Sequence, residues 1–284
     1  MPQTAVTISV VLYKNDPIHI KELVKSVLAS KVKVDIYFSD NSPTSELSKL
    51  IPTKSNIYYS HNTSNLGYGR ANNSVIKSCL NTGDYHLVMN ADVFFERGTL
   101  ERIVDFMDRN QSVGLVLPRV LNPDGTKQPL FKLLPSPFDL LLRRFAPGFL
   151  KQLLEERLKR YEMNFANEMD TFDAPYLSGC FMFFRKEALR EVGIFDERFF
   201  LYCEDIDISR RVRTRWRTTY FSEATIYHHF NKGSYKNLRM LFYHVRSAIQ
   251  YFNKHGWIYD AQRKEINQET LRAFEYKEVV VAYD

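Results

Sequence analysis

Apolar runs and amphipathic stretches alternate along the first 110 residues of the chain. Short runs rich in β-branched and aromatic residues predict strands, and stretches with apolar positions three or four residues apart predict helices. Strands separated by helices of this length are typical of βαβ units, so we predict an α/β fold with a mostly parallel sheet flanked by helices. The predicted strands are 5–13, 34–39, 57–60 and 85–89, and the predicted helices are 18–30, 68–80 and 99–109.

Three later segments extend this pattern. Residues 177–184 (LSGCFMFF) predict a further strand, and Leu238 to Phe252 predicts an amphipathic helix. Residues 133–160 combine leucine and phenylalanine with an excess of arginine and lysine. That combination is typical of a helix lying on a membrane surface, and equally of a helix that covers the core of its own domain.

The composition excludes several classes of protein. Of the 284 residues, 44% are hydrophobic and 25% charged, and the 11 Gly, 11 Pro and 3 Cys exclude collagen-like, disordered and disulfide-stabilised chains. Cys79, Cys180 and Cys203 have no CxxC spacing, so we expect neither a zinc site nor a disulfide. Free cysteines are typical of a protein in the reducing cytoplasm, which is the location we expect. The N-terminal sequence has no signal-peptide pattern, and no apolar run reaches the roughly 18 residues of a membrane-spanning helix.

The net charge is +6, from 39 lysines and arginines against 33 aspartates and glutamates. A basic chain suits nucleic acid, an anionic membrane surface or a phosphorylated substrate. Residues 210–217 hold five arginines and one tryptophan, a stripe that favours nucleic acid. The stripe directly follows an acidic cluster, however, and we expect it to balance those carboxylates or substrate phosphates. We therefore predict no nucleic-acid binding.

Polar side chains follow three of the predicted strands at their ends. They are Tyr13 after the first strand, Asp40 and Asn41 after the second, and Asn90 and Asp92 after the fourth. Ligands of parallel α/β sheets bind beyond the carboxyl ends of the strands, so this placement favours a nucleotide site. Each residue taken alone is equally explained by turn formation or helix capping. The three positions together favour the site.

The densest acidic cluster comprises Glu204, Asp205 and Asp207, after an aromatic run that ends at Tyr202. Carboxylates in the first turn of a helix interact favourably with its dipole, which is one explanation of the cluster. Apolar surroundings also raise the pKa of a carboxylic acid and make it a candidate general base.

A second candidate site involves divalent metal. Asp92 is a candidate oxygen ligand for Mg²⁺ or Mn²⁺, since these cations prefer carboxylates and phosphate oxygens. An imidazole from the pair His228 and His229 suits Mn²⁺. The sequence leaves open which of the two histidines is the ligand.

These motifs, in this order, resemble the glycosyltransferase family 2 enzymes of GT-A fold, and in particular the rhamnosyltransferase-type members. The resemblance covers about residues 5–255. The matching segments are 9–13 (SVVLY), 40–42 (DNS), 62–73 (NTSNLGYGRANN), 90–92 (NAD), 177–180 (LSGC), 193–207 (GIFDERFFLYCEDID), and His229 with Ser234.

The resemblance implies a nucleotide-sugar donor and a metal ion. Tyr13 and Asp40 match positions that contact base and ribose, and small residues after the third strand match positions where the backbone approaches the donor. Asp92 and His229 match metal ligands, while Asn90 departs from the DxD motif and implies modest metal affinity without donor. The full donor set is Tyr13, Asp40, Asn41, Asn65, Gly67, Gly69, Asn72, Asn90 and Asp92.

The resemblance also implies inversion by direct displacement, with Asp205 as the general base and Glu204 orienting it or the acceptor. Gly179, Tyr202 and Glu204 are the implied acceptor contacts. Asp207 is expected to pair with Arg210 or Arg211. We expect Asp92, Asp205 and His229 to converge in one cleft around a pyrophosphate.

The implied reaction moves a sugar, L-rhamnose from dTDP-rhamnose or another sugar from a UDP-sugar, to a glycan or polyprenyl-diphosphate-linked acceptor. Such enzymes take part in the synthesis of bacterial surface polysaccharides such as O antigen, at the inner face of the membrane. The resemblance is also compatible with a homodimer. The implied catalytic domain is 1–235, with a donor half to about 110 and an acceptor half from 111, and 236–284 is a helical, membrane-associating region.

The sequence argues against two other functions. A non-catalytic sugar-nucleotide or glycan binder of the same fold needs no general base, so the Glu204–Asp205 pair and His229 argue against it. A dinucleotide-dependent oxidoreductase requires a GxGxxG after the first strand, where this chain has Tyr13-Lys-Asn-Asp-Pro.

Overall fold

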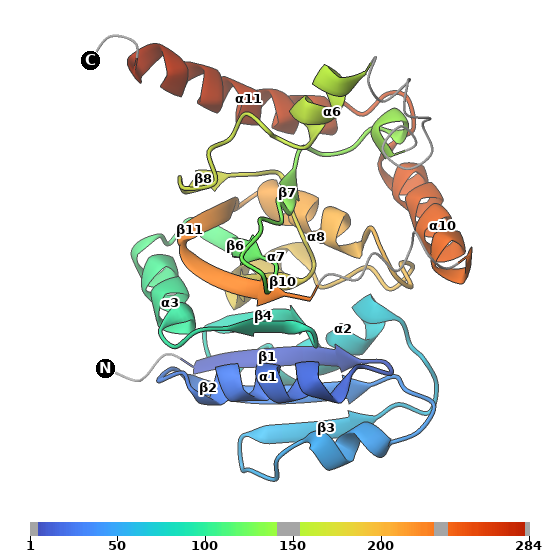
Figure 1. The fold of residues 1–284 in the computed structure, drawn as a ribbon. Helices are drawn as coiled ribbons and strands as arrows, with labels where there is room; N and C mark the ends of the chain where they lie inside the picture. Colours follow the sequence, from blue (N-terminus) through green and yellow to red (C-terminus); the bar gives the residue numbers. More distant parts are fainter. Residues whose placement is uncertain (1–4, 141–153, 230–237, 282–284) are drawn as a thin grey trace.

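The computed structural model describes residues 5–140, 154–229 and 238–281. Within these ranges nine strands form one sheet in the order β3-β2-β1-β4-β10-β6-β11-β5, with β8 beside β11, and β7 and β9 form a separate two-stranded sheet (Figure 1). The strands are β1 Ala5–Leu12, β2 Lys33–Asp40, β3 Ile57–His61, β4 Tyr85–Asn90, β5 Val93–Phe95, β6 Val113–Leu121, β7 Phe131–Lys132, β8 Phe172–Asp173, β9 Tyr176–Leu177, β10 Phe181–Arg185 and β11 Arg217–His228.

Helices flank the sheet, which confirms the predicted α/β class. In Figure 1, α1 lies in front of the first strands and α2 behind them. The helices are α1 Pro17–Leu28, α2 Tyr68–Cys79, α3 Thr99–Arg109, α6 Glu155–Tyr161, α7 Lys186–Val192, α8 Glu204–Arg213, α10 Leu238–His255 and α11 Ala261–Val281, with a 3₁₀ turn at Glu46–Leu50. None of the helices in these ranges combines the length and apolar character needed to cross a bilayer.

The predicted elements of the first 110 residues are confirmed, each within two residues of its observed ends. The prediction of one strand over 177–184 is wrong, because β9 ends at Leu177 and β10 begins at Phe181. The intervening backbone turns away from the sheet: the Gly179 N–H donates to the Asp205 carboxylate at 3.0 Å, and the Ser178 N–H donates to the Leu130 carbonyl at 2.9 Å.

The direction of β10 determines what meets at the edge of the sheet. Strands β3, β2, β1 and β4 are parallel, whereas β10 runs antiparallel between β4 and β6. The start of β10 therefore lies beside the carboxyl end of β4, where the Asn90 N–H donates to the Cys180 carbonyl at 2.9 Å. This pairing brings Gly179 next to the polar residues that follow β1 and β4.

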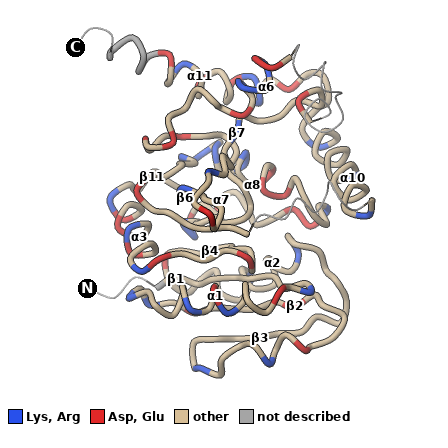
Figure 2. Tube along the Cα trace, viewed as in Figure 1, with Lys and Arg blue, Asp and Glu red and all other residues tan. Residues whose placement is uncertain are grey.

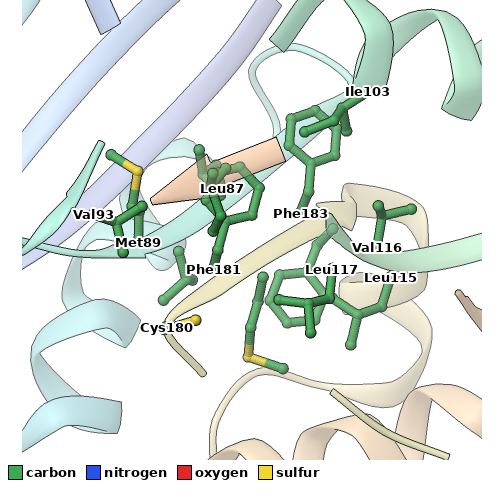
Figure 3. Close-up of a cluster of buried hydrophobic side chains, with 14 of the residues drawn as sticks. Leu87, Met89, Val93, Ile103, Leu115, Val116, Leu117, Cys180, Phe181 and Phe183 are labelled. Atoms are coloured by element: carbon green, nitrogen blue, oxygen red, sulfur yellow. The ribbon is translucent and has the colours of Figure 1, made fainter. Parts of the chain in front are cut away.

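The core is built on strands that are buried on both faces. In β1, Val6, Ile8, Val10 and Leu12 are fully buried on one side, as expected for central parallel strands. Figure 3 shows the continuation of this core across β4, β10 and β6, where each fully buried side chain contributes roughly 1.5–3 kcal/mol relative to an exposed one. The labelled side chains include Leu87, Met89, Leu115, Leu117, Phe181 and Phe183.

The stretch 133–160 lies partly outside the described residues, which omit 141–153. In the described part, Leu133 and Leu134 are buried. Arg157 pairs with Asp139 at 2.8 Å, and Lys159 pairs with Glu155 at 2.9 Å. In their described part these segments contribute to the protein's own core, and Arg157 and Lys159 are paired.

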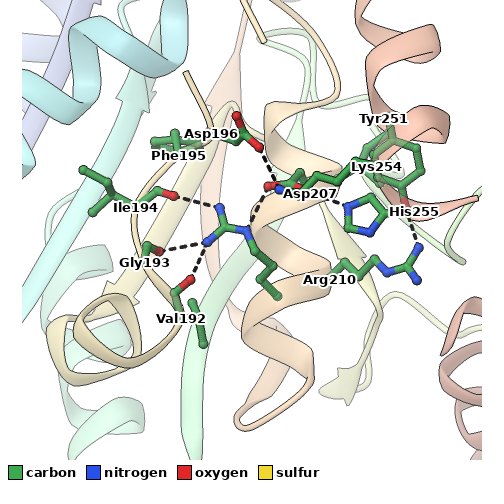
Figure 4. A network of polar contacts seen from close by, with 12 residues as sticks. Val192, Gly193, Ile194, Phe195, Asp196, Asp207, Arg210, Tyr251, Lys254 and His255 are labelled. Atoms are coloured by element: carbon green, nitrogen blue, oxygen red, sulfur yellow. Dashed lines mark hydrogen bonds and ion pairs between the residues drawn. The ribbon is translucent and has the colours of Figure 1, made fainter. Parts of the chain in front are cut away.

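Polar contacts join α8 to the C-terminal helices (Figure 4). Asp207, which is 0% exposed, contacts the Arg211 Nε at 2.9 Å, the Lys254 Nζ at 2.6 Å and the His255 Nε2 at 2.8 Å. The Arg211 contact confirms one of the two predicted partners of Asp207. Arg210 instead forms a buried pair with Asp260 at 2.6 Å. Helix α10 and the start of α11 are thereby fixed to α8.

We predict that Asp207→Asn destabilises the protein by about 1.5–3 kcal/mol at pH 7, because the partly exposed Arg211 and Lys254 lose charged hydrogen bonds to a buried carboxylate. Burial alone would raise the pKa of Asp207, but His255, Arg211 and Lys254 lower it to about 2. Its folded pKa thus lies below the unfolded value, so its contribution is complete above pH ~4 and is lost as the pH falls towards 2. Urea unfolding of both proteins between pH 2 and 7 measures this.

Glu156→Gln serves as the control, because Glu156 forms only an exposed pair with Lys159, and we expect its unfolding midpoint to match that of the wild type. A wild-type midpoint for Asp207→Asn at pH 7 would contradict the assigned role.

Candidate active site

A cleft of about 490 Å³ opens at the carboxyl ends of β1 and β4. Strand ends, the start of α2, residues 200–201 and the first turns of α10 form its walls. It is lined by Val11, Tyr13, Lys14, Asn15, Asn41, Asn65, Gly67, Tyr68, Asn90, Ala91, Asp92, Phe200, Leu201, Arg239, Met240 and Tyr243. A larger cavity of about 810 Å³ lies between α6 and α11, but none of the predicted site residues lines it.

Six of the nine predicted donor residues line the cleft: Tyr13, Asn41, Asn65, Gly67, Asn90 and Asp92. They come from three strand ends and from the loop between β3 and α2. The remaining three, Asp40, Gly69 and Asn72, lie elsewhere, for reasons that their contacts explain.

Asp40 is fully buried at the end of β2. Its Oδ1 accepts the Ser42 N–H at 2.8 Å and its Oδ2 accepts the Tyr59 hydroxyl at 2.7 Å. Both carboxylate oxygens are thus used within the protein, and the residue shapes the 40–42 turn beneath the cleft. This differs from the expectation that Asp40 faces the base and ribose.

Asn72 and Gly69 belong to the packing of α2. Asn72 is fully buried, accepts the Ser9 hydroxyl at 2.7 Å and donates to the Tyr68 carbonyl at 3.1 Å. A Cβ on Gly69 would lie 3.2 Å from the Cβ of Phe195, so the small residue accommodates that side chain rather than a donor. Both residues were expected to contact the donor, but neither of them lines the cleft.

Gly67 lines the cleft and also permits a close backbone approach. Its φ is +83°, and a Cβ there would lie 2.4 Å from the carbonyl oxygen of Phe200. The Tyr68 N–H donates to that same carbonyl at 2.8 Å. The glycine is therefore required by the contact between the start of α2 and the segment before α8, and side chains are excluded at this position.

Asp92 has a histidine neighbour, but it is His228 rather than His229. The His228 Nε2 lies 3.5 Å from the Asp92 Oδ1. The His229 imidazole instead contacts Glu22 at 2.9 Å and stacks on His19 at 4.2 Å. Only the backbone N–H of His229 reaches Asp92, donating to its carbonyl at 3.0 Å. Ser234, which follows in the motif, lies outside the described residues.

Asp205 is held in one orientation at the start of α8. Its Oδ2 accepts the Gly179 N–H and the Tyr176 hydroxyl, each at 3.0 Å, and its Oδ1 accepts the Ile206 N–H at 2.9 Å. Burial raises the pKa of Asp205, and the hydrogen bonds from Gly179 and Tyr176 limit that rise. A fixed carboxylate with a raised pKa has the properties of a general base.

Glu204 differs from its neighbour in having fewer hydrogen bonds. The residue is 5% exposed, and its Oε2 has no hydrogen-bond partner within the described part of the chain. Burial first, and then the charge of Asp205, raise the pKa of Glu204 well above its usual range. Three hydrogen bonds reach the Asp205 carboxylate and none reaches the Glu204 Oε2 within the described residues, so ionisation is less favourable at Glu204 than at Asp205.

The turn before α8 is strained. Tyr202 and Cys203 have φ values of +72° and +64°, in the left-handed region that residues with a side chain rarely adopt. The Tyr202 ring packs edge-on against His244 of α10 at 5.1 Å. This conformation reverses the chain directly before Glu204, which allows the first turn of α8 to face Gly179.

Tyr68 joins the acidic pair to the cleft. It lines the cleft, and its hydroxyl donates to the Gly179 carbonyl at 2.8 Å. Burial raises its pKa most, and the charges of Glu204, Asp205 and Asp92 raise it further. The charges of Asp92 and Asp205 also add to the effect of burial that raises the pKa of Cys180 to about 12. Asp205 does not itself line the cleft, and Gly179 links it to Tyr68, which lines the cleft together with Asp92, while the His229 imidazole contacts Glu22.

The residues present fit a divalent cation only in part. Asp92 and His228 offer one carboxylate oxygen and one imidazole, and the described residues contain no cluster of three or more such ligands. Mg²⁺ and Mn²⁺ sites of this kind are completed by substrate phosphates and water. Asp92 and His228 would therefore hold such an ion together with a diphosphate, rather than alone.

Several residues of the cleft were not predicted, among them Lys14, Tyr68, Arg239 and Tyr243. Arg239 and Tyr243 belong to α10, whose apolar spacing predicted the helix but gave no indication that its first turns border the cleft. Tyr68 lies between two glycines of the segment 62–73, and an aromatic residue at that position was the feature of the sequence that could have indicated a contact in the cleft.

Comparison with known proteins identifies relatives of this chain. Residues 8–193 match the profile of the family described as glycosyl transferase family 2. The N-acetylglucosaminyl-diphospho-decaprenol L-rhamnosyltransferases of two Mycobacterium tuberculosis strains, CDC 1551 / Oshkosh and ATCC 25618 / H37Rv, are each 27% identical over 277 residues, which is 90% of this chain and 86% of theirs.

Solved structures resemble the fold. GalNAc-T7, crystallised with UDP, GalNAc and Mn²⁺, superimposes on 80% of this chain with a TM-score of 0.60 and 13% identity, and the chain spans 44% of that protein. Residues 1–349 of S. aureus TarS give a TM-score of 0.56 with 18% identity, covering 94% of this chain and 70% of that fragment. These similarities confirm the predicted GT-A architecture.

Proposed function

The chain belongs to glycosyl transferase family 2, and we propose that this glycosyltransferase is an inverting enzyme that moves L-rhamnose from dTDP-rhamnose to a hydroxyl group of a lipid-linked glycan. The observation that carries the proposal is a chain of contacts from the cleft to Asp205: Tyr68 lines the cleft together with Asp92, the Tyr68 hydroxyl donates to the Gly179 carbonyl, and the Gly179 N–H donates to the Asp205 carboxylate. One carboxylate faces the expected diphosphate, and the other is suited to remove a proton.

In the proposed reaction, the acceptor hydroxyl gives its proton to the carboxylate of Asp205 as its oxygen bonds to the anomeric carbon of the donor. The bond from that carbon to the diphosphate oxygen breaks on the opposite side, and its electron pair leaves with the nucleoside diphosphate. One displacement inverts the anomeric centre, so no carboxylate nucleophile is required. The hydrogen bonds from Gly179 and Tyr176 orient Asp205 for this transfer.

Protonated Glu204 avoids placing a second negative charge beside Asp205 and supplies a hydrogen-bond donor next to the acceptor. Tyr202, in the strained turn, belongs to the same acceptor side. When bound, Mg²⁺ or Mn²⁺ neutralises charge on the leaving diphosphate, and Asp92 and His228 are the residues that would hold it. The cleft residues Tyr13, Asn41, Asn65 and Asn90 are the proposed contacts of the remaining donor.

The choice of sugar and acceptor rests on the mycobacterial relatives, whose names specify L-rhamnose and an N-acetylglucosaminyl-diphospho-decaprenol acceptor. We propose the same classes here, with a UDP-sugar as the alternative donor. An acceptor carried on a polyprenyl diphosphate places the reaction at a membrane surface, at the inner face of the cell membrane.

We propose that α10 provides the membrane contact. Leu238, Phe242, Val245 and Ile249 follow one face of the helix, and Leu238 and Phe242 are 84% and 60% exposed. The helix contains no acidic residue, as Figure 2 illustrates, so anionic headgroups meet no repulsion from it. An exposed apolar stripe on an acid-free helix suits the plane of a bilayer interface. Its first turns border the cleft, which keeps the acceptor close.

We predict that Asp205→Asn lowers the rate of rhamnosyl transfer by roughly 10²–10⁴-fold, the usual contribution of a general base. Binding of dTDP, measured by calorimetry, should remain unchanged. The rate of the wild type should fall as the pH drops through the raised pKa of Asp205, and this acidic limb should lie above the ordinary range of an aspartate.

Asp105→Asn, an exposed site on α3, is the control and should retain wild-type transfer. Comparable turnover by Asp205→Asn would remove this residue from the role of base, and wild-type protein that transfers no sugar from any dTDP or UDP donor would overturn the proposed function.

We predict that Mn²⁺ strengthens dTDP binding to the wild type and that Asp92→Ala and His228→Gln lose this gain. His229→Gln should keep it, because its imidazole contacts Glu22 instead. Calorimetric titration of dTDP with Mn²⁺ and with EDTA measures the difference. Equal affinity under both conditions in the wild type would argue against a metal site. Loss of the Mn²⁺ effect in His229→Gln but not in His228→Gln would show that His229, and not His228, is the metal ligand.

We predict that Phe242→Asp weakens sedimentation with anionic phosphatidylglycerol vesicles. Met169→Asp is the matched control, because Met169 is exposed to the same degree, 61% against 60%, but lies on the loop before β8. Equal sedimentation of both variants, or a wild-type protein that ignores the vesicles, would contradict contact through α10.

A further inference from the structure

The cleft contains few charged side chains for a site expected to hold a diphosphate. Among the described residues that line it, Asp92 is the one carboxylate, and Lys14 and Arg239 are the cations. A diphosphate bears several negative charges, and its charge on the leaving oxygen grows as the sugar departs. With Asn90 where a second carboxylate was expected, the metal site is reduced to Asp92 and one imidazole.

The arginine stripe of residues 210–217 does not supply the missing positive charge. Arg210 pairs with Asp260 at 2.6 Å, and Arg211 pairs with Asp207 at 2.9 Å. Arg213 and Arg217 both contact Asp173, at 3.2 and 2.8 Å. These guanidinium groups balance carboxylates within the protein, and none of them lines the cleft.

Arg239 is positioned by the first turns of α10. Its Nε donates to the Tyr243 hydroxyl at 3.1 Å, and its guanidinium carbon lies 5.8 Å from the centre of the Tyr243 ring. Tyr243 in turn packs on Phe200 at 4.6 Å, whose carbonyl accepts the Tyr68 N–H. The guanidinium is therefore tied to the wall of the cleft that also holds the start of α2.

The opposite wall lies within electrostatic reach of Arg239. Tyr243 first, and Tyr13 to a smaller extent, raise the pKa of Arg239. Because Tyr13 follows β1 and also lines the cleft, Arg239 and the strand ends face the same space. Arginine offers several N–H donors in a planar arrangement that matches phosphate oxygens, which makes it more than a diffuse charge.

We propose that Arg239 is a donor-binding residue that contacts the diphosphate of the nucleotide-sugar and stabilises it as the leaving group. The inference rests on the proposed function, because it requires a nucleoside diphosphate in the cleft. When the bond from the anomeric carbon to the diphosphate oxygen breaks, the electron pair passes to that oxygen, and the guanidinium N–H groups donate to the phosphate oxygens. A residue of the C-terminal helix thereby completes a site built by the strand ends.

The test compares nucleotide binding with nucleoside binding. Dissociation constants for dTDP, UDP, thymidine and uridine are measured in EDTA for the wild type, Arg239→Gln, Arg239→Lys and Arg246→Gln. Arg246 is the matched control, since it is an exposed arginine on α10 outside the cleft lining. Thermal unfolding of each variant reports its folding.

For Arg239→Gln we expect at least a tenfold loss of affinity for the better-binding diphosphate, with nucleoside affinity and unfolding temperature unchanged. Arg239→Lys should recover part of the loss, because it restores charge without the planar donors, and Arg246→Gln should match the wild type. In turnover assays Arg239→Gln should lower kcat as well as kcat/KM, since the contact strengthens in the transition state.

Unchanged diphosphate affinity in Arg239→Gln would overturn the assignment while leaving the proposed function intact. An equal loss for diphosphate and nucleoside would also overturn it, because the residue would then shape the cleft rather than contact phosphate. A wild type that binds neither dTDP nor UDP would overturn both this inference and the proposed function.

Discussion

The site depends on one antiparallel pairing within a mostly parallel sheet. Because β10 runs against β4, the residues that precede β10 lie at the carboxyl end of β4 instead of at the far edge. The hydrogen bond from the Asn90 N–H to the Cys180 carbonyl fixes this register. Gly179 then presents its N–H to Asp205 and its carbonyl to Tyr68. With β10 reversed, the carboxylate on α8 and the carboxylate after β4 would not share a neighbourhood.

The first turn of α8 shows how partners decide the behaviour of similar groups. Glu204, Asp205 and Asp207 lie within four residues, Glu204 and Asp207 buried and Asp205 partly exposed, and the pKa values of Glu204 and Asp205 are raised whereas that of Asp207 is lowered. Asp207 meets two cations, Arg211 and Lys254, and the His255 imidazole, which lower its pKa, whereas burial and the neighbouring Asp205 raise the pKa of Glu204. Asp205 lies between these extremes, since neutral donors orient it. Structural anchoring and proposed proton transfer thus come from adjacent positions on one helix.

The sequence was sufficient for the elements and the family, and insufficient for the direction of individual side chains. Periodicity located β1, α1 and α2 because burial on one or both faces leaves a regular pattern. The motif residues Asp40 and Asn72 look the same in the sequence as Asn65 and Asn90, which line the cleft, but Asp40 and Asn72 are buried in contacts with Tyr59 and Ser9. Such contacts join residues far apart in the chain. The same holds for Arg239, since only the packing of α10 against residues 200–202 brings it to the cleft.

The polar contacts from α8 to Lys254, His255 and Asp260 limit which parts of the protein can change independently in evolution. The C-terminal helices cannot be exchanged as an independent module, because their loss would remove the counter-ion of the buried Arg210 and would leave Asp207 with Arg211 alone. A chimera that folds must therefore contain Lys254, His255 and Asp260, or residues equivalent to them, together with α8. Sequence variation in the C-terminal helices is therefore tolerated best on the solvent-facing side of α10, where substitutions do not disturb the helix that bears Asp205.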